Sequence, residues 1–227
     1  MSDDDEYKIE AKSDNVSDVG TFESVTTGDI DYLPPKEIPD QDLYHSHSWW
    51  TTYVFSQDAK YIGLEPYNWV TAWLAITDAN KENGCMRMWS GSHKEKIKEH
   101  KDTFNENNLL TRGQTVQNVP LEDTTPNILK AGQLSLHHPM IVHGSGSNKS
   151  NTRRIGFVIQ SYIGTNVDQV IGKVYVQQAR GKDNFKYHEH TKRPSELMNK
   201  EDINIRIKAN NELSKIFYND AKKQGKY

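Results

Sequence analysis

Short runs of β-branched and aromatic residues, separated by turn signals, occupy most of the chain after residue 49. Such runs predict strands, because these side chains pack well on a pleated surface. Near-helical spacing of apolar residues appears only in the tail, over about residues 195–221, with Ser195 as the expected cap. Many strands and few helices predict an all-β sandwich or jelly roll with a few peripheral helices, including a C-terminal one. The predicted strands cover residues 53–55, 69–76, 85–89, 132–136 and 155–159, and Asn83-Gly84 predicts a tight hairpin turn that leads into the strand at 85–89.

Charge is distributed unevenly along the chain. Residues 1–42 carry 13 acidic and 3 basic side chains, a net charge of −10, whereas the whole chain has a net charge of −3. This stretch contains too few large apolar residues to offset the entropy cost of ordering it. We therefore expect residues 1–42 to form an acidic, flexible arm, and residues 43–227 to form one domain with a helical tail.

Composition also excludes several classes of protein. The chain contains no apolar run long enough for a membrane span and no recognisable signal peptide, so we expect a cytoplasmic protein that does not bind membranes. A pI near 6.3 provides no basic footprint for nucleic acid. The single cysteine, Cys85, excludes a disulfide framework and a cysteine-based zinc site. With nucleic acid and membranes excluded, we expect the partner to be a small-molecule substrate. The sequence does not predict an oligomeric state.

Histidines and carboxylates are the main candidates for chemistry. His45 and His47 share one face of an extended chain, a possible metal pair for which a solvated pair is the competing interpretation. His137 and His138 precede His143 in a second histidine-rich run. Because His138 and His143 are separated by an odd number of residues, a regular strand would direct them to opposite faces, so at most one of them should face a given site.

Two blocks of sequence stand out by their motifs. The first comprises residues 73–79, 83–87 and 91–94, and the second comprises residues 138–139, 143–150 and 153–154. In their order and spacing these blocks resemble the phytanoyl-CoA dioxygenase family, over roughly residues 56–165. The resemblance implies a double-stranded β-helix (jelly roll, cupin-like) that uses Fe(II), with 2-oxoglutarate and O₂ as cosubstrates, to hydroxylate a small molecule.

The resemblance also assigns roles to individual residues. Asp58 aligns with the metal-binding carboxylate and His143 with the distal metal-binding histidine, 85 residues further along the chain. Two histidines and one carboxylate hold Fe(II) on one side and leave positions open for a 2-oxo acid and O₂. Arg154 matches the arginine that binds the distal carboxylate of 2-oxoglutarate, for which a guanidinium fork is suited. Three further residues fall where the family lines the cosubstrate pocket: Gln57, Trp73 and Ser145.

The sequence departs from the family at the first metal ligand. The family's histidine should stand at position 56, where this chain has Ser56, and a neutral hydroxyl is a poor ligand for Fe(II). The triad is therefore expected to be incomplete, and the short segment before the motif is compatible with a partial or diverged copy. Three interpretations remain open at this stage. They are an oxygenase with an unconventional third ligand, an inactive relative that binds a ligand or partner, and an unrelated jelly-roll binding protein.

Overall fold

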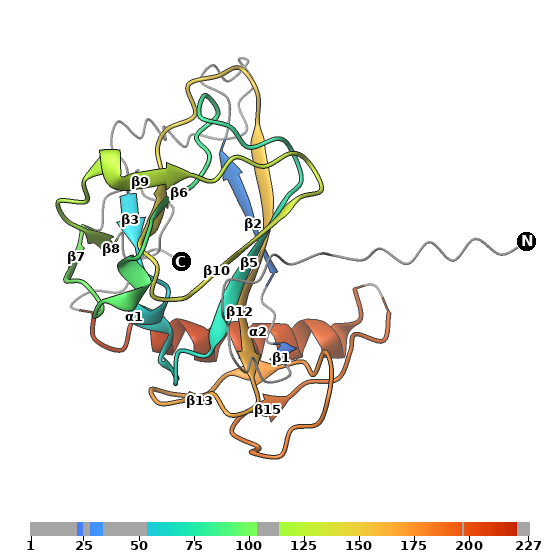
Figure 1. Cartoon of the computed structure of the whole chain (residues 1–227). Coiled ribbons are helices and arrows are strands. Elements are labelled where there is room, and N and C mark those ends of the chain that lie inside the picture. Colours follow the sequence, from blue (N-terminus) through green and yellow to red (C-terminus); the bar gives the residue numbers. More distant parts are fainter. Residues whose placement is uncertain (1–21, 25–27, 34–53, 104–113, 197, 222–227) are drawn as a thin grey trace, which may run out of the picture.

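The computed structural model describes residues 22–24, 28–33, 54–103, 114–196 and 198–221 (Figure 1). Most of these residues lie in short antiparallel strands, with one long helix near the C-terminus. The predicted all-β core with a C-terminal helix is confirmed. His45 and His47 lie outside the described residues, as does most of the predicted acidic arm.

The larger sheet, here called the first sheet, is built around one long central strand. Its strands follow the order β1–β12–β5–β10, and β2 also pairs with β12. All of these pairings are antiparallel. The bounds are β1 Phe22–Ser24, β2 Gly28–Leu33, β5 Trp69–Ala75, β10 Leu134–His137 and β12 Arg154–Gly164.

Two strands of the first sheet come from the acidic stretch. β1 and β2 pair with opposite ends of β12 and so attach this part of the chain to the core. The predicted domain boundary at residue 42 stays a prediction.

The second sheet has the order β3–β11–β6–β9 and is antiparallel throughout. It stands opposite the first sheet in Figure 1. The strands before and after Asn83-Gly84 belong to different sheets, β5 to the first and β6 to the second. The hairpin that Asn83-Gly84 predicts is therefore absent between them. The bounds are β3 Val54–Ser56, β6 Arg87–Trp89, β9 Thr124–Pro126 and β11 His143–Ser145.

Smaller elements complete the described structure. Three two-stranded pairs join β4 Leu64–Glu65 to β13 Asp168–Gln169, β7 His100–Asp102 to β8 Gln114–Val116, and β14 Tyr175–Val176 to β15 Glu189–His190. The helices are α1 Ala59–Ile62, the 3₁₀ turns Ser92–Lys94 and Leu121–Asp123, and α2 Lys200–Phe217. Within the described residues, no helix is both long and apolar enough to cross a membrane.

The C-terminal helix begins later than the sequence predicts. Asn199 is its N-cap, and the Asn199 side chain accepts hydrogen bonds from the backbone N–H groups of Glu201 and Asp202. Ser195 instead donates to the Asp202 carboxylate from its backbone N–H and its hydroxyl, at 2.9 and 3.1 Å. Asn is as good a cap as Ser, and acidic residues in the first turn complement the helix dipole, so the helix begins at the second of two available signals.

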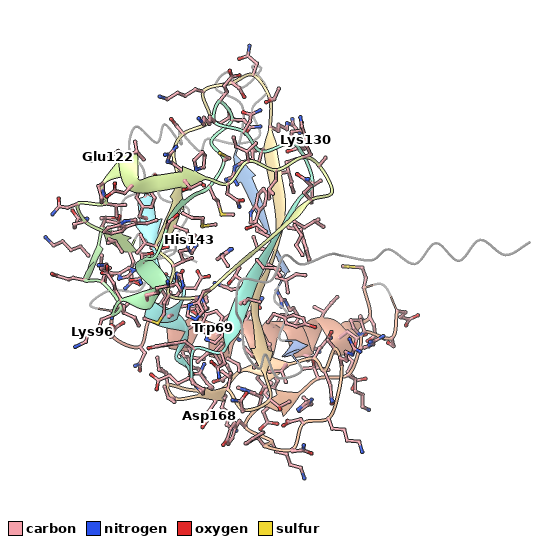
Figure 2. The ribbon with its side chains drawn as sticks, viewed as in Figure 1. Trp69, Lys96, Glu122, Lys130, His143 and Asp168 are labelled. Atoms are coloured by element: carbon pink, nitrogen blue, oxygen red, sulfur yellow. The ribbon has the colours of Figure 1, made fainter. Side chains whose placement is uncertain are left out.

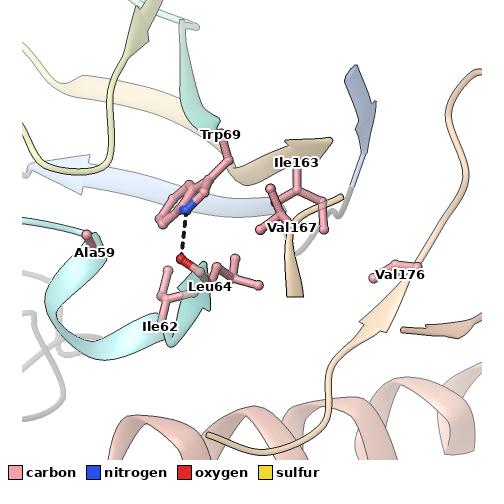
Figure 3. Packing of buried hydrophobic residues seen from close by; sticks show 7 residues of the cluster. All are labelled: Ala59, Ile62, Leu64, Trp69, Ile163, Val167 and Val176. Carbon is pink, nitrogen blue, oxygen red and sulfur yellow. Dashed lines mark hydrogen bonds between the residues drawn. The ribbon is translucent and has the colours of Figure 1, made fainter. Parts of the chain in front are cut away.

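The core at the lower end of the first sheet packs around Trp69 (Figure 3). The Trp69 indole N–H donates to the Leu64 carbonyl at 3.3 Å, which gives this buried polar atom a partner. Phe217 of α2 packs against the same cluster and so closes this end of the molecule. The buried members are Ala59, Ile62, Leu64, Trp69, Ile163, Val167 and Val176.

A second cluster joins the two sheets further along β5. Trp73 and Ala75 of β5 pack with Cys85 and Met86, and Met88 of β6 lies against them. The pleat of β5 directs Thr71 and Trp73 to the same face, which is the face turned toward the second sheet. Polar side chains on this face are therefore enclosed between the sheets.

Gly144 allows the β3 and β11 backbones to approach closely. A Cβ atom at this position would lie 1.9 Å from the carbonyl oxygen of Val54, and a backbone atom cannot move aside as a side chain can. We expect Gly144→Ala to lower the free energy of unfolding by roughly 1–3 kcal/mol or more, because overpacking forces the strands apart. Urea denaturation measures the change, with Ser145→Ala on the same strand as the control. Equal stability of the two variants would contradict the close approach.

Candidate metal centre

Asp58, His137 and His143 converge between the two sheets. One possible ligand atom from each of the three lies within 4.8 Å of the others. The Asp58 carboxylate oxygens are 3.7 Å from Nε2 of His137 and 3.7 Å from Nε2 of His143. The two imidazole rings are 4.8 Å apart between centroids. Among the described residues, this is the one group of three or more such side chains close enough to hold a metal ion.

Each of the three residues is placed by a different element. Asp58 is the residue before α1, at the end of the buried run that follows β3. His137 ends β10 and lies opposite Thr71 in the first sheet. His143, labelled in Figure 2, begins β11 and lies between Ser56 and Met88 in the second sheet. The connection over residues 138–142 carries the chain from one sheet to the other, so both histidines reach the same place.

His143 is held in the tautomer that a metal ligand needs. Its Nδ1 lies 3.0 Å from the carbonyl oxygen of Ile141. A carbonyl can only accept, so Nδ1 carries the proton in this contact. The neutral ring then keeps a lone pair on Nε2, the atom that faces Asp58.

His137 is neutral and buried. Burial lowers the pKa of His137 to about 4, with the neighbouring His143 adding to the effect. The contact with Asp58 is therefore not an ion pair at neutral pH. Within the described part of the chain, Nδ1 of His137 is buried without a hydrogen-bond partner. Buried polar atoms are almost always satisfied, so a buried imidazole with an unpartnered nitrogen, next to a second imidazole and a carboxylate, fits a bound cation.

Two hydroxyl groups hold the Asp58 carboxylate in place. Thr71 donates to Oδ2 at 2.7 Å, and Tyr61 donates to Oδ1 at 3.4 Å. Burial and the Asp58 charge raise the pKa of Tyr61 far above its ordinary value, so the phenol keeps its proton. The Tyr61 ring also packs edge-on against Phe217, at 5.8 Å between centroids, which links α2 to the centre.

The Thr71 hydroxyl gives a direct test of this support. We expect Thr71→Val, which keeps the shape of the side chain, to lower Fe(II) affinity by about 10–100-fold, because hydrogen bonds to metal-binding carboxylates orient them. Anaerobic metal titration measures the change. Thr191→Val is the matched control, since the Thr191 hydroxyl donates to the carbonyl of Val176 on a peripheral strand. Equal metal affinity in the two variants would show that Thr71 does not support Asp58.

The expectation of an incomplete triad is corrected by His137. Ser56 is buried and lies opposite His143 in register, and its hydroxyl bonds with Tyr61. The imidazole that the family places at position 56 is instead matched by one from β10. The prediction that at most one of His138 and His143 faces a given site is consistent with the structure, because His143 belongs to this group and His138 does not. The parity argument did not consider His137, which lies on a strand of the other sheet.

The remaining predicted site residues occupy different surroundings. Arg154 is buried at the start of β12, and its guanidinium carbon lies 5.4 Å from the centre of the Trp73 ring. The Trp73 ring lies over Gly156, where a Cβ would be 2.2 Å from the indole. Ser145 is two residues beyond His143 on β11 and therefore shares its face. Gln57 is fully buried, with its amide bonded to the backbone at Met140 and Lys98.

A centre of two histidines and one carboxylate, with other coordination positions open, is typical of the non-haem Fe(II) oxygenases. Residues 48–156, just under half of the chain, match the protein family described as "Phytanoyl-CoA dioxygenase (PhyH)". The family comprises 2-oxoglutarate-dependent dioxygenases of the Fe(II) and 2-oxoglutarate oxygenase superfamily, which act on small-molecule substrates.

Curated relatives match part of the chain. The peroxisomal phytanoyl-CoA dioxygenase of Mus musculus is 29% identical over 96 residues, which are 41% of this chain and 28% of that protein. A probable alpha-ketoglutarate-dependent hypophosphite dioxygenase of Stutzerimonas stutzeri is 26% identical over 145 residues, 63% of this chain and 46% of that protein. The chain thus spans less than half the length of these two relatives. A 33-residue match to alternative cytochrome c oxidase subunit 1 of Bradyrhizobium diazoefficiens, 64% identical, covers only 6% of that protein and carries no functional inference.

A solved structure shares the fold over most of the chain. The non-heme monooxygenase ThoJ, in its apo form, superposes with a TM-score of 0.70 and 25% sequence identity, over 87% of this chain and 68% of ThoJ. Its nickel complex superposes with a TM-score of 0.64 and 23% identity, over 87% of this chain and 67% of that chain. The double-stranded β-helix expected from the sequence is thereby confirmed.

Proposed function

We propose that this chain is an Fe(II)- and 2-oxoglutarate-dependent oxygenase that hydroxylates a small molecule, with Asp58, His137 and His143 as the metal ligands. The convergence of these three side chains within 4.8 Å carries the proposal. Ser56 was the feature that favoured an inactive relative, and His137 removes that reason because it provides the second imidazole.

The residues around the centre would each have a separate task. Thr71 and Tyr61 hold the Asp58 carboxylate by hydrogen bonds, and the Ile141 carbonyl fixes the His143 ring. Fe(II), when bound, supplies the one-electron chemistry that activates O₂. The protein contributes binding and orientation of the reactants around the open coordination positions.

Arg154 is the proposed anchor for 2-oxoglutarate. It is the one basic side chain among the fully buried residues of the described chain, and it projects from the face of the first sheet that also carries Thr71 and Trp73. A buried guanidinium binds a carboxylate strongly, because charge-assisted hydrogen bonds are not weakened by water. Trp73 would form a wall beside this anchor, and Ser145 would line the opposite side from β11.

Metal-dependent turnover of the cosubstrate tests this function. The protein is loaded anaerobically with Fe(II) and 2-oxoglutarate, then exposed to ¹⁸O₂ with ascorbate present. We expect 2-oxoglutarate to lose CO₂ and form succinate that carries one ¹⁸O atom. The second oxygen atom hydroxylates a substrate or, without one, is reduced to water by ascorbate. Succinate formation that does not depend on Fe(II), or no succinate at all from iron-loaded protein, would contradict the proposal.

A further inference from the structure

Gln57 connects the segment that carries Asp58 to two other parts of the chain. Its side-chain amide N–H donates to the carbonyl oxygen of Met140 at 2.5 Å. Its side-chain oxygen accepts from the backbone N–H of Lys98 at 2.7 Å. Met140 lies in the connection between His137 and His143, so one side chain spans from the carboxylate ligand to the segment between the two imidazoles.

His100 holds the backbone of Gln57. The Gln57 backbone N–H donates to Nε2 of His100 at 3.1 Å, and Nδ1 of the same ring lies 2.8 Å from the carbonyl of Lys98. The carbonyl can only accept, so the proton is on Nδ1 and Nε2 is free to accept. Burial lowers the pKa of His100, which keeps the ring neutral as this arrangement requires. Both nitrogens of His100 are therefore used within the protein.

We propose that Gln57 and His100 form a clamp that positions the three metal ligands, and that Gln57 is a positioning residue rather than a ligand of 2-oxoglutarate. This inference rests on the proposed function, because it concerns the same metal centre. The Gln57 amide donates one N–H to Met140 and accepts from Lys98 through its oxygen, and the side chain is fully buried. The amide has a second N–H, but moving the side chain onto the cosubstrate would break at least one of these two bonds in a buried place, which costs roughly the desolvation of the group left unpaired.

The clamp acts on geometry, so its loss should affect the metal first. Metal-binding residues must be held close to their productive arrangement, and supporting hydrogen bonds typically change metal affinity by about 10–100-fold. The backbone N–H of Ala59 also donates to the carbonyl of Pro139 at 3.0 Å, so loss of the Gln57 bond to Met140 removes one of the direct links between the Asp58 segment and the connection between the two histidines. Binding of 2-oxoglutarate to protein already saturated with metal should change little.

The test compares two affinities in matched variants. Gln57→Met keeps the volume and the neutral charge of the side chain but removes both hydrogen bonds, and His100→Phe keeps a ring but removes both nitrogens. Gln133→Met is the control, because the Gln133 side chain also accepts a backbone N–H, from Lys130 at 2.7 Å, in an exposed turn. We expect the first two variants to bind Fe(II) about 10–100-fold more weakly and the control to be unchanged. The affinity of the metal-saturated proteins for 2-oxoglutarate should stay within about threefold of the unsubstituted protein's.

The opposite pattern would overturn the inference. Unchanged metal affinity with weakened 2-oxoglutarate binding would make Gln57 a cosubstrate ligand, and no change in either affinity would show that the clamp has no role. Unfolding of both variants would assign these residues to the fold rather than to the metal centre.

A measurement on metal-free protein separates this inference from the proposed function. Nitrogen NMR should show His100 as the neutral Nδ1–H tautomer, with a scalar coupling across the hydrogen bond from the Gln57 backbone nitrogen to Nε2. If the coupling is present but the unsubstituted protein binds no Fe(II), the proposed function fails while the hydrogen-bonded connection itself stands. If Fe(II) binds but the coupling is absent, the clamp fails alone.

Discussion

His137→Ala should lower the affinity for Fe(II) by at least about 100-fold, because it removes one of three protein ligands. Mutation of a residue that only supports a ligand typically lowers metal affinity by about 10–100-fold, so removal of a direct ligand should lower it at least as much. His143→Ala should have a similar effect, since its imidazole is equally close to Asp58. Anaerobic titration of Fe(II) measures the loss, and circular dichroism checks that the variants keep their strands.

The control for this prediction is Ser56→Ala. Ser56 is as buried as His137 and lies opposite His143 in register, but its hydroxyl bonds with Tyr61. We expect Ser56→Ala to retain metal affinity within a few-fold. A centre in which Ser56→Ala abolishes binding and His137→Ala does not would return the third position to β3 and remove His137 from the triad.

Arg154→Leu should weaken binding of 2-oxoglutarate by about one to two decades while Fe(II) affinity is retained. Losing a hydrogen bond between charged groups costs roughly 1.5–3 kcal/mol, which corresponds to this change in affinity. Calorimetric titration of 2-oxoglutarate into metal-loaded protein measures it, with the Fe(II) replaced by a redox-inert divalent ion to prevent turnover.

Arg153→Leu is the matched control for Arg154. The two arginines are neighbours in sequence, but Arg153 is exposed and Arg154 is buried on the face that carries Trp73. Adjacent residues entering a strand point in opposite directions, so only one of them can serve the interior. Equal cosubstrate affinity in the two variants would remove Arg154 as the anchor.

The overall fold could be predicted because the strand signal is local. The aromatic and β-branched residues of β5 and the β-branched residues of β12 indicate strands without knowledge of their partners. Pairing is not local, which is why Asn83-Gly84 predicts a hairpin between strands that belong to different sheets. The predicted start of α2 at Ser195 was wrong for a similar reason. Ser195 and Asn199 are both good caps, and which of them caps the helix depends on the hydrogen bonds that Ser195 makes with the Asp202 carboxylate.

The site could be predicted only in part. Asp58 and His143 follow from motif spacing, whereas His137 comes from a strand of the other sheet that no spacing rule connects to them. The pattern in β10 is misleading, because Leu134 and Leu136 share one face and Ser135 and His137 the other, which predicts the leucines in the interior. In the structure Leu134 and Leu136 are exposed, whereas His137 is buried and lies opposite Thr71. The role of Gln57 could not be inferred from the motif, because its partners Met140 and Lys98 are more than 40 residues away.

The most direct test of the account is a crystal structure of the protein loaded anaerobically with Fe(II) and 2-oxoglutarate, with iron located by its anomalous scattering. We expect one iron ion bound by the Asp58 carboxylate and by one imidazole nitrogen each of His137 and His143. The 2-oxo acid should complete the coordination, with its distal carboxylate against Arg154. Iron located away from Asp58, or bound there without His137, would contradict the central claim.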